Sequence, residues 1–283
     1  MKFQQTIAAE LEISGQALHN GTMGKMRILP QPADTGIYFL RSDLPGKPRV
    51  KADVHSVIDT QKSVTVGKDD WHISTIEHLL AVFHGLGIDN ALVEVDGEEL
   101  PSGDGSGLYF SQRILDIGLT TQDEPRRYTY IREPVWVEGI VYKQDEPLKS
   151  MMIALPGDEF EVSFTFTSDH KATGTQYFQY RLSSDTFVRE IAPARTIAFL
   201  KEIEYLRSQG LALSDDYDRV VLVGEEGYLN ELRFPEEIVR HKILDLIGDL
   251  YLLGPLYGRI VAIRSGHTLD LQLTKKILQQ TGF

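Results

Sequence analysis

Residues 239–254, VRHKILDLIGDLYLLG, show the apolar spacing that predicts a helix. The apolar positions that recur at this spacing are Ile243, Leu244, Ile247, Leu250 and Tyr251. His241 and Asp245 are four residues apart, so they share one face of this helix, one turn apart. An imidazole and a carboxylate placed in this way are natural ligands of Zn²⁺. For this helix alone, a buried His with a hydrogen-bonded Asp is the more ordinary interpretation.

A second apolar stripe, in residues 74–86 (STIEHLLAVFHGL), predicts another helix. Ser74 stands where an N-cap is expected, and Glu77 is three residues on, as in a capping box. His78 follows Glu77 in the predicted first turn, which is also where His241 stands in the later helix. The ordinary interpretations are a capping role for Glu77 and partial burial for His78.

Most other apolar runs predict strands separated by turns. We expect strands over residues 3–13, 25–29, 35–41, 90–95, 135–142, 151–155, 160–166, 175–180, 220–223 and 258–264, and helices over 108–117, over 197–208 and from Thr268. Asn20-Gly21 is a hairpin signal, and the polar segment 120–134, with two Pro, is typical of a linker. His19 falls in a loop, where a surface position is the ordinary expectation, and His267 falls in a Ser-Gly-His turn.

The two halves of the chain resemble each other. Each has several strands, then a long apolar helix with a His in its first turn, then Gly and another strand. We therefore predict an α+β fold of two similar domains, residues 1–124 and 125–283, each a β-sheet layer packed with helices, and we interpret them as a duplication. If the two helices pack together, His78, His241 and Asp245 converge between the domains, where small-molecule sites tend to lie.

Composition and charge narrow the classes of protein. The 283 residues are 42% hydrophobic and 25% charged, which is ordinary for a globular protein with a sizeable core. There is no Cys, so a metal site must use His, Asp or Glu. We see no signal peptide and no apolar run of membrane-spanning length, and we expect a cytoplasmic protein. The net charge of −12 argues against nucleic-acid binding.

The candidate ligands indicate a catalytic metal site. Two His and one carboxylate leave the fourth position of a zinc ion open for water. Such an ion lowers the pKa of the water and polarises a carbonyl oxygen. Glu77 is placed to act as the base, and a protonated His267 to donate to a departing amine. Asp249 follows Asp245 by four residues and is placed either to orient His267 or to support the metal ligands from behind. The residues alone predict a metal-assisted hydrolase of an amide or ester.

Several motifs, in this order, resemble those of the UDP-3-O-acyl-N-acetylglucosamine deacetylases of lipid A biosynthesis. They are the early SGQALHNG, STIEHLLAVFHGLGIDNALVEVDGEELPSGDGSG, ARTIAFLKEIEYLRSQGLAL, RFPEEIVRHKILDLIGDLYLLG and SGH. The resemblance covers nearly the whole chain. It implies a zinc-dependent amidase with two similarly folded α+β domains and an active site between them. The implied reaction removes acetate from UDP-3-O-acyl-N-acetylglucosamine; Fe²⁺ suits the same ligands. We expect a monomer that approaches the membrane only transiently.

The resemblance also implies roles for individual residues. The zinc ligands would be His78, His241 and Asp245. The catalytic residues would be Glu77 as general base, His267 as general acid or electrostatic partner, Thr196 as support for the oxyanion, and Asp249 beside them. The substrate-binding residues would be Lys242, His19 and Arg264. Residues 197–223 would form an insert that holds the acyl chain, with Leu206, Leu211 and Leu213 either lining its passage or packing as ordinary core.

Some segments depart from the pattern common in that family. Ile197 replaces an aromatic residue, Ser214-Asp215-Asp216 replaces a Gly-Gly-Ser run, Lys171 replaces the Pro of Asp-His-Pro, and Ser102-Gly103 replaces bulkier residues. None of these is a proposed ligand, base or acid, so they bear on acyl-chain length and inhibitor fit. They leave a non-catalytic paralogue that binds a UDP-sugar as the alternative. A zinc peptidase is disfavoured because no HExxH motif is present.

Overall fold

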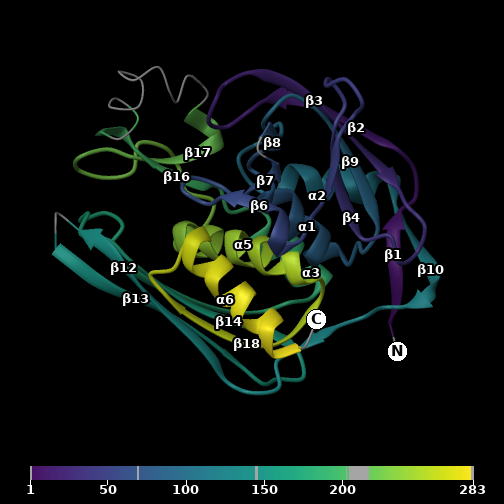
Figure 1. Ribbon diagram of the computed structural model, residues 1–283. Coiled ribbons are helices and arrows are strands. Elements are labelled where there is room, and N and C mark those ends of the chain that lie inside the picture. Colours follow the sequence, from purple (N-terminus) through teal and green to yellow (C-terminus); the bar gives the residue numbers. More distant parts are fainter. Residues whose placement is uncertain (1, 69, 144–145, 202, 204–216, 282–283) are drawn as a thin grey trace.

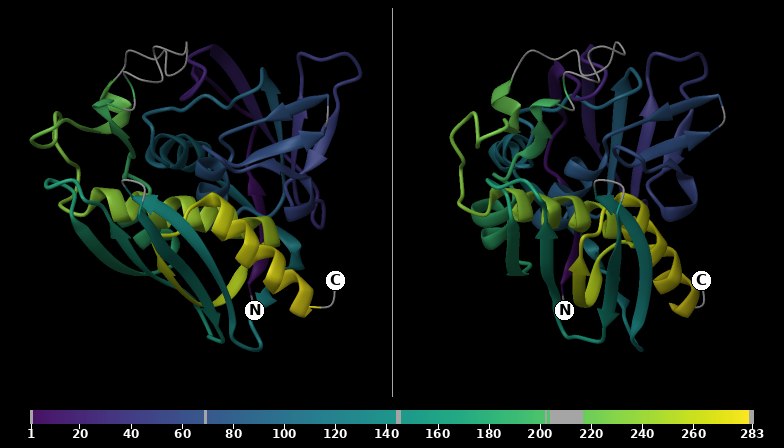
Figure 2. Two further views of the ribbon diagram at one scale, coloured as in Figure 1. Left: turned by 60° about the vertical axis from the view of Figure 1, so that its left-hand side comes forward. Right: turned by 90° about the vertical axis from the view of Figure 1, so that its left-hand side faces the viewer.

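Two mixed β-sheets form the outer layers of the molecule, and the longer helices lie between them (Figure 1). The computed structural model describes residues 2–68, 70–143, 146–201, 203 and 217–281. Figure 2 shows the same succession of layers from two further sides. The fold is therefore α+β, as the apolar patterns predict. Among the residues described, no helix has both the length and the apolar character needed to cross a bilayer.

The first sheet has five strands in the order β2-β3-β9-β4-β5. Their bounds are β2 (Leu11–Gln16), β3 (Met23–Pro30), β9 (Ala91–Asp96), β4 (Ile37–Arg41) and β5 (Arg49–Lys51). Neighbours are antiparallel except β4 and β9, which are parallel. The predicted hairpin joins β2 to β3, with Gly21 at a φ of +68°, a conformation that glycine adopts without steric cost.

The second sheet has six strands, in the order β12-β13-β18-β14-β15 with β11 beside β18. Their bounds are β12 (Val135–Lys143), β13 (Glu146–Leu155), β18 (Leu256–Ile263), β14 (Phe160–Thr167), β15 (Thr175–Arg181) and β11 (Thr129–Tyr130). β18 is parallel to β14 and antiparallel to β13. In each of the two main sheets, the strand that comes last in the sequence lies in the middle. In both sheets this strand is antiparallel to its neighbour on one side and parallel to its neighbour on the other. A duplication would leave this likeness; the duplication and the division after residue 124 stay predictions.

Smaller strand groups complete the fold. They are β1 (Phe3–Ile7) with β10 (Leu119–Pro125), β6 (Val57–Asp59) with β7 (Thr65–Lys68) and β8 (Trp71–Ile73), and β16 (Thr196–Phe199) with β17 (Val220–Val223). The single strand predicted over residues 3–13 is wrong, because the chain turns between β1 and β2. The predicted linker 120–134 is wrong at its start, because β10 pairs with β1.

The helix predicted over residues 197–208 is wrong for its first residues. Residues 196–199 form β16, which runs parallel to β17. Ile197 and Phe199 pack on a small core around Val221, Val223 and Ile238, so tertiary burial outweighs the helical pattern. The segment 204–216 lies outside the described residues, and with it Leu206, Leu211, Leu213 and Ser214-Asp215-Asp216.

Helices α1 and α5 pack against each other between the sheets. The helices whose bounds are described are α1 (Glu77–Leu86), α2 (Leu108–Ile117), α3 (Ser184–Thr186), α5 (Glu237–Leu250) and α6 (His267–Thr281), with short helical turns η1 (Val54–Ser56), η2 (Phe187–Ile191), η3 (Tyr217–Arg219) and η4 (Tyr251–Leu253). α5 lies over β14 and β15, and α6 over β12 and β13. Every residue of α1 is buried, including His84, which stacks on Tyr251.

Candidate metal centre and active site

The crossing of α1 and α5 brings the candidate metal ligands together. Gly248 on α5 faces the backbone of Glu77 so closely that a Cβ at position 248 would collide with the Glu77 carbonyl oxygen. Because the helices approach this closely, His78 in the first turn of α1 lies beside His241 of α5. Their ring centroids are 4.9 Å apart and the rings are almost perpendicular, at 86°.

One carboxylate oxygen faces both imidazoles. Asp245 Oδ1 is 3.2 Å from His241 Nε2 and 3.4 Å from His78 Nε2. This oxygen is buried, and in the described part of the chain no donor forms a hydrogen bond of normal geometry with it. Metal–ligand lengths of about 2.0–2.1 Å and tetrahedral angles place the ligand atoms of a zinc ion about 3.3 Å apart. The three side chains thus have the spacing and the donor set of a metal site.

Neighbouring groups orient these candidate ligands. His241 Nδ1 lies 3.0 Å from the carbonyl oxygen of Ala194, which leaves Nε2 directed at Asp245. The Lys242 ammonium donates to Asp245 Oδ2 at 2.9 Å. Burial opposes ionisation of Asp245, but the charges of His241 and Lys242 outweigh it and hold the pKa of this carboxyl well below its ordinary value. Asp245 is therefore an anion, as a metal ligand must be.

Glu77, the residue before His78, does not form a capping box, so the capping prediction is wrong. Ser74 is held in an extended bridge, where its hydroxyl donates to the Glu98 carbonyl. Ile76 takes the N-cap position without a side-chain hydrogen bond. The Glu77 carboxylate instead accepts a hydrogen bond from the Val64 backbone amide at 3.0 Å. This contact ties the Glu77 carboxylate to a distant segment and not to its own helix end.

Burial raises the pKa of the Glu77 carboxyl, and the nearby charges of Asp245 and Asp249 act in the same direction. The charges of His267 and His78 oppose this rise. These effects show that Glu77 shares one buried electrostatic environment with the candidate metal ligands. A raised pKa also suits a carboxylate that must accept a proton and release it again.

His267 and Asp249 form a buried pair beside this cluster. His267 Nδ1 lies 2.8 Å from Asp249 Oδ2. His267 is the first residue of α6, so the turn predicted for it is in fact the helix start. Burial disfavours a charged imidazole, but the charge and hydrogen bond of Asp249, with the charges of Glu77 and Asp245, outweigh it and raise the pKa of His267 to about 10. His267 is therefore a protonated donor at neutral pH.

Thr196 and His19 come from other elements. Thr196 begins β16, directly after Arg195, whose buried guanidinium pairs with Glu237 at the start of α5. His19 is half-buried, although its loop position suggests a surface residue, and its backbone amide donates to Glu99 at 2.8 Å. Burial lowers the pKa of His19, and the charges of His78 and His267 lower it further. His19 thus lies within electrostatic reach of the cluster.

Arg264 is engaged with the backbone of its own sheet. Its Nε donates to the Lys149 carbonyl at 2.8 Å, and its main chain has a φ of +56°, which is unusual for a residue other than glycine. Among the described residues, no hydrogen bond or ion pair joins its side chain to the cluster. Its predicted role in binding substrate stays a prediction.

Sequence reasoning missed Asp270. It lies on α6 one turn after His267, and its carboxylate, with Asp249 and His267, forms a second group of side chains whose ligand-type atoms lie within 4.8 Å of one another. The available signal was the spacing of three residues between His267 and Asp270, which places both on one face of a helix. That signal required knowing that the helix begins at His267.

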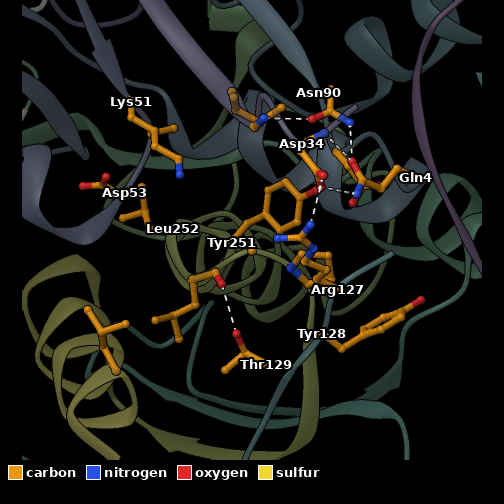
Figure 3. A pocket seen from close by; sticks show the side chains of 18 residues that line it. Gln4, Asp34, Lys51, Asp53, Asn90, Arg127, Tyr128, Thr129, Tyr251 and Leu252 are labelled. Atoms are coloured by element: carbon orange, nitrogen blue, oxygen red, sulfur yellow. Dashed lines mark hydrogen bonds and ion pairs between the residues drawn. The ribbon is translucent and has the colours of Figure 1, made fainter. Parts of the chain in front are cut away.

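A separate hollow lies at the other end of α5 (Figure 3). It has a volume of about 450 Å³ and is lined by 18 residues, none of them a candidate site residue. Several of its polar groups satisfy one another: Asp34 accepts from Gln4 at 2.8 Å and from Arg127 at 2.9 Å, and Thr129 donates to the Leu253 carbonyl. This hollow is therefore separate from the candidate site, which is identified by the geometry of its ligand atoms.

Comparison with known proteins gives one consistent result. The family model described as LpxC, UDP-3-O-acyl N-acetylglycosamine deacetylase, matches residues 4–279. Three curated relatives are named UDP-3-O-acyl-N-acetylglucosamine deacetylase. The protein of Syntrophus aciditrophicus is 37% identical, covering 99% of this chain and 87% of the relative. That of Syntrophotalea carbinolica is 39% identical, covering 98% and 88%, and that of Trichormus variabilis is 40% identical, covering 97% and 98%. This chain therefore belongs to the LpxC family of UDP-3-O-acyl N-acetylglycosamine deacetylases.

Proposed function

We propose that this protein is a zinc-dependent hydrolase that removes the N-acetyl group from UDP-3-O-acyl-N-acetylglucosamine and releases acetate, a step of lipid A biosynthesis. The observation that carries the proposal is the convergence of His78, His241 and Asp245 on one point, with Glu77 and a protonated His267 in the same buried environment. The names of the relatives support the choice of substrate.

The proposed ligands suit a zinc ion because two imidazoles and one carboxylate leave a fourth position open. When bound, such an ion makes a water molecule more acidic and polarises a carbonyl oxygen. Fe²⁺ accepts the same kinds of ligand, so metal content must be measured as well as activity. Asp245 holds its negative charge through Lys242, and Ala194 fixes the orientation of His241.

The side chains around the metal site perform the proton transfers. Glu77 takes a proton from the attacking water while the oxygen of that water bonds to the acetyl carbon. The Thr196 hydroxyl donates a hydrogen bond to the oxyanion that develops. His267 then gives its proton to the amide nitrogen as the carbon–nitrogen bond breaks, and Asp249 holds the imidazole in place throughout. The products are acetate and a free amine.

Substrate binding is proposed for Lys242, His19 and Arg264. Lys242 has three N–H donors and uses one on Asp245, so another remains for a substrate oxygen or phosphate. We assign the acyl chain to the insert of about residues 197–223, only part of which is described. We also propose two domains, residues 1–124 and 125–283, and a cytoplasmic monomer that meets the membrane transiently.

The direct test is acetate release by the purified, zinc-loaded protein. UDP-3-O-acyl-N-acetylglucosamine is the substrate, and UDP-N-acetylglucosamine without the acyl chain is the matched control. We expect rapid release from the acylated compound and much slower release from the control, because binding energy from the acyl chain is used in turnover. Binding of both compounds without turnover of either would favour the non-catalytic UDP-sugar-binding paralogue.

A further inference from the structure

Asp270 lies beside the His267–Asp249 pair without a role in the reaction described so far. It stands on α6 one turn after His267, and α6 runs alongside α5 (Figure 1). Asp249 and Asp270 are each only 1% exposed. Two carboxyl groups are therefore packed together in the interior, where two negative charges side by side are strongly disfavoured.

The hydrogen bonds of these two carboxyl groups are incomplete. Asp249 uses Oδ2 to hold His267 Nδ1, but its Oδ1 is buried without a hydrogen-bond partner among the described residues. Asp270 Oδ1 is buried and without a partner in the same part of the chain. Ionised carboxylates can only accept, so two of them cannot satisfy each other. A single proton held between them would satisfy both.

The charges around Asp270 favour its neutral form. Burial raises the pKa of Asp270 well above its ordinary value, and the charge of Asp249 raises it further. His267 and the Ser265 hydroxyl oppose this rise, as does Lys242, whose charge interacts with Asp270. The first turn of α6 also favours an anion, but the helix dipole is a weaker influence than burial beside a like charge.

Among the residues whose side chains are described, the other elements packed against α6 bring no charge to this point. The buried residues of β12 and β13 beneath α6 are apolar, among them Val135, Val137, Met152 and Ala154, with the exception of Ser150, which donates to the Arg264 carbonyl. η4 contributes buried Tyr251 and Leu252, and the one ionisable side chain of η1, His55, is exposed.

We propose that Asp270 is a positioning residue that stays protonated and donates a hydrogen bond to Asp249 Oδ1, fixing the carboxylate whose Oδ2 holds His267. This inference rests on the proposed function for its effect on turnover. A donor on Oδ1 draws charge away from Asp249, so His267 binds its proton less tightly and gives it up more readily to the amine. The second candidate metal group is thus a proton-sharing group.

Two substitutions separate this role from simple packing. In Asp270→Asn the side-chain amide can donate to Asp249 in the same place, so kcat and the basic limb of the pH profile should stay close to those of the wild type. Asp270→Leu keeps the bulk and removes the donor. We expect kcat to fall about 10- to 100-fold with KM little changed, as for other residues that orient a reacting group, and the basic limb to move to higher pH.

An ionised Asp270 would give the opposite result. Its charge would help to hold the proton on His267, so Asp270→Asn would move the basic limb to lower pH, and that outcome would overturn the proposal. A cation shared by Asp249, His267 and Asp270 would also overturn it. In that case the wild type would contain one more metal ion per chain than Asp270→Asn.

A spectroscopic measurement tests the proton without using activity. The infrared difference spectrum of the zinc-loaded wild type against Asp270→Asn should contain the carbonyl band of a protonated carboxylic acid. Absence of that band refutes the proposal even if Asp270→Leu fails to fold. If the band is present but the wild type releases no acetate, the proposed deacetylase function is refuted, and the proton shared by Asp249 and Asp270 is still supported.

Discussion

Gly248 on α5 lies against the backbone carbonyl of Glu77 on α1, with no room for a side chain between them. A glycine within a helix costs about 0.5–1 kcal/mol of stability relative to alanine. The chain has this destabilising glycine where α1 and α5 cross. That crossing sets the distance between His78 on α1 and the pair His241 and Asp245 on α5. The candidate metal centre therefore depends on backbone packing as much as on its proposed ligands.

Gly248→Ala should separate α1 from α5. The added methyl group meets backbone and not a flexible side chain, so we expect a loss of about 1–3 kcal/mol in the free energy of unfolding, together with weaker zinc binding and lower activity. Chemical denaturation and metal titration measure the two effects. Gly227→Ala is the matched control, because nothing lies within 4 Å of a Cβ at that position. Equal zinc affinity in both variants would contradict this account of the crossing.

Asp245→Ala should lose the metal. The change removes the oxygen that faces both imidazoles and leaves His78 and His241 without their shared partner. Zinc content after dialysis against a chelator measures the effect. Asp116→Ala, at an exposed position of α2, serves as the control and should retain zinc. Zinc retained by Asp245→Ala at the level of the control would show that Asp245 is not a ligand.

Glu77→Gln should keep the metal and lose activity. The glutamine can still accept the hydrogen bond from the Val64 amide, so the local structure is preserved, but it cannot take a proton from water. We expect kcat to fall about 10²- to 10⁴-fold, the usual contribution of a general base. Steady-state kinetics on samples with matched zinc content provide the measurement. Turnover close to that of the wild type would exclude Glu77 as the base.

His267 should set the basic limb of the pH profile. In the proposed reaction His267 acts in its protonated form, and its pKa is raised to about 10, so activity should fall as the pH rises through about 10. Asp249→Asn removes the main charge that holds the proton, and the limb should move down toward about 6.5, the ordinary value for histidine. Measurement of kcat against pH for the wild type and for Asp249→Asn tests this. If kcat falls over the same range of high pH in both proteins, the result would argue against the pairing of His267 with Asp249.

The same shift makes stability depend on pH. The pKa of His267 is higher in the folded than in the unfolded chain, so folding favours its proton. This contribution is complete below about pH 6.5 and is lost as the pH rises through about 10. Denaturation midpoints between pH 7 and 10 should therefore fall more steeply for the wild type than for Asp249→Asn.

Local patterns in the sequence were sufficient to predict several helices and strands. α2 and β17 have the bounds that periodicity predicts, residues 108–117 and 220–223. The spacing of four between His241 and Asp245 places both side chains on one helix face, as the structure shows. Such features depend on neighbours in the chain, and the sequence contains those neighbours directly.

Other features depend on contacts between distant segments. Glu77 matched a capping box by spacing, but Val64 binds its carboxylate. Residues 196–199 form a strand because β17 lies beside them, and nothing in their own pattern requires it. Asp270 becomes important only because Asp249, on another helix, lies next to it. These pairings arise from tertiary packing, which local periodicity does not describe.

Acetate release from UDP-3-O-acyl-N-acetylglucosamine, measured before chelation, after chelation and after zinc is restored, tests the central claim most directly. The zinc content of each sample should be determined in parallel. We predict that activity disappears with the metal and returns with one zinc ion per chain. Full activity in the metal-free protein, or no acetate from protein with zinc bound, would contradict the account.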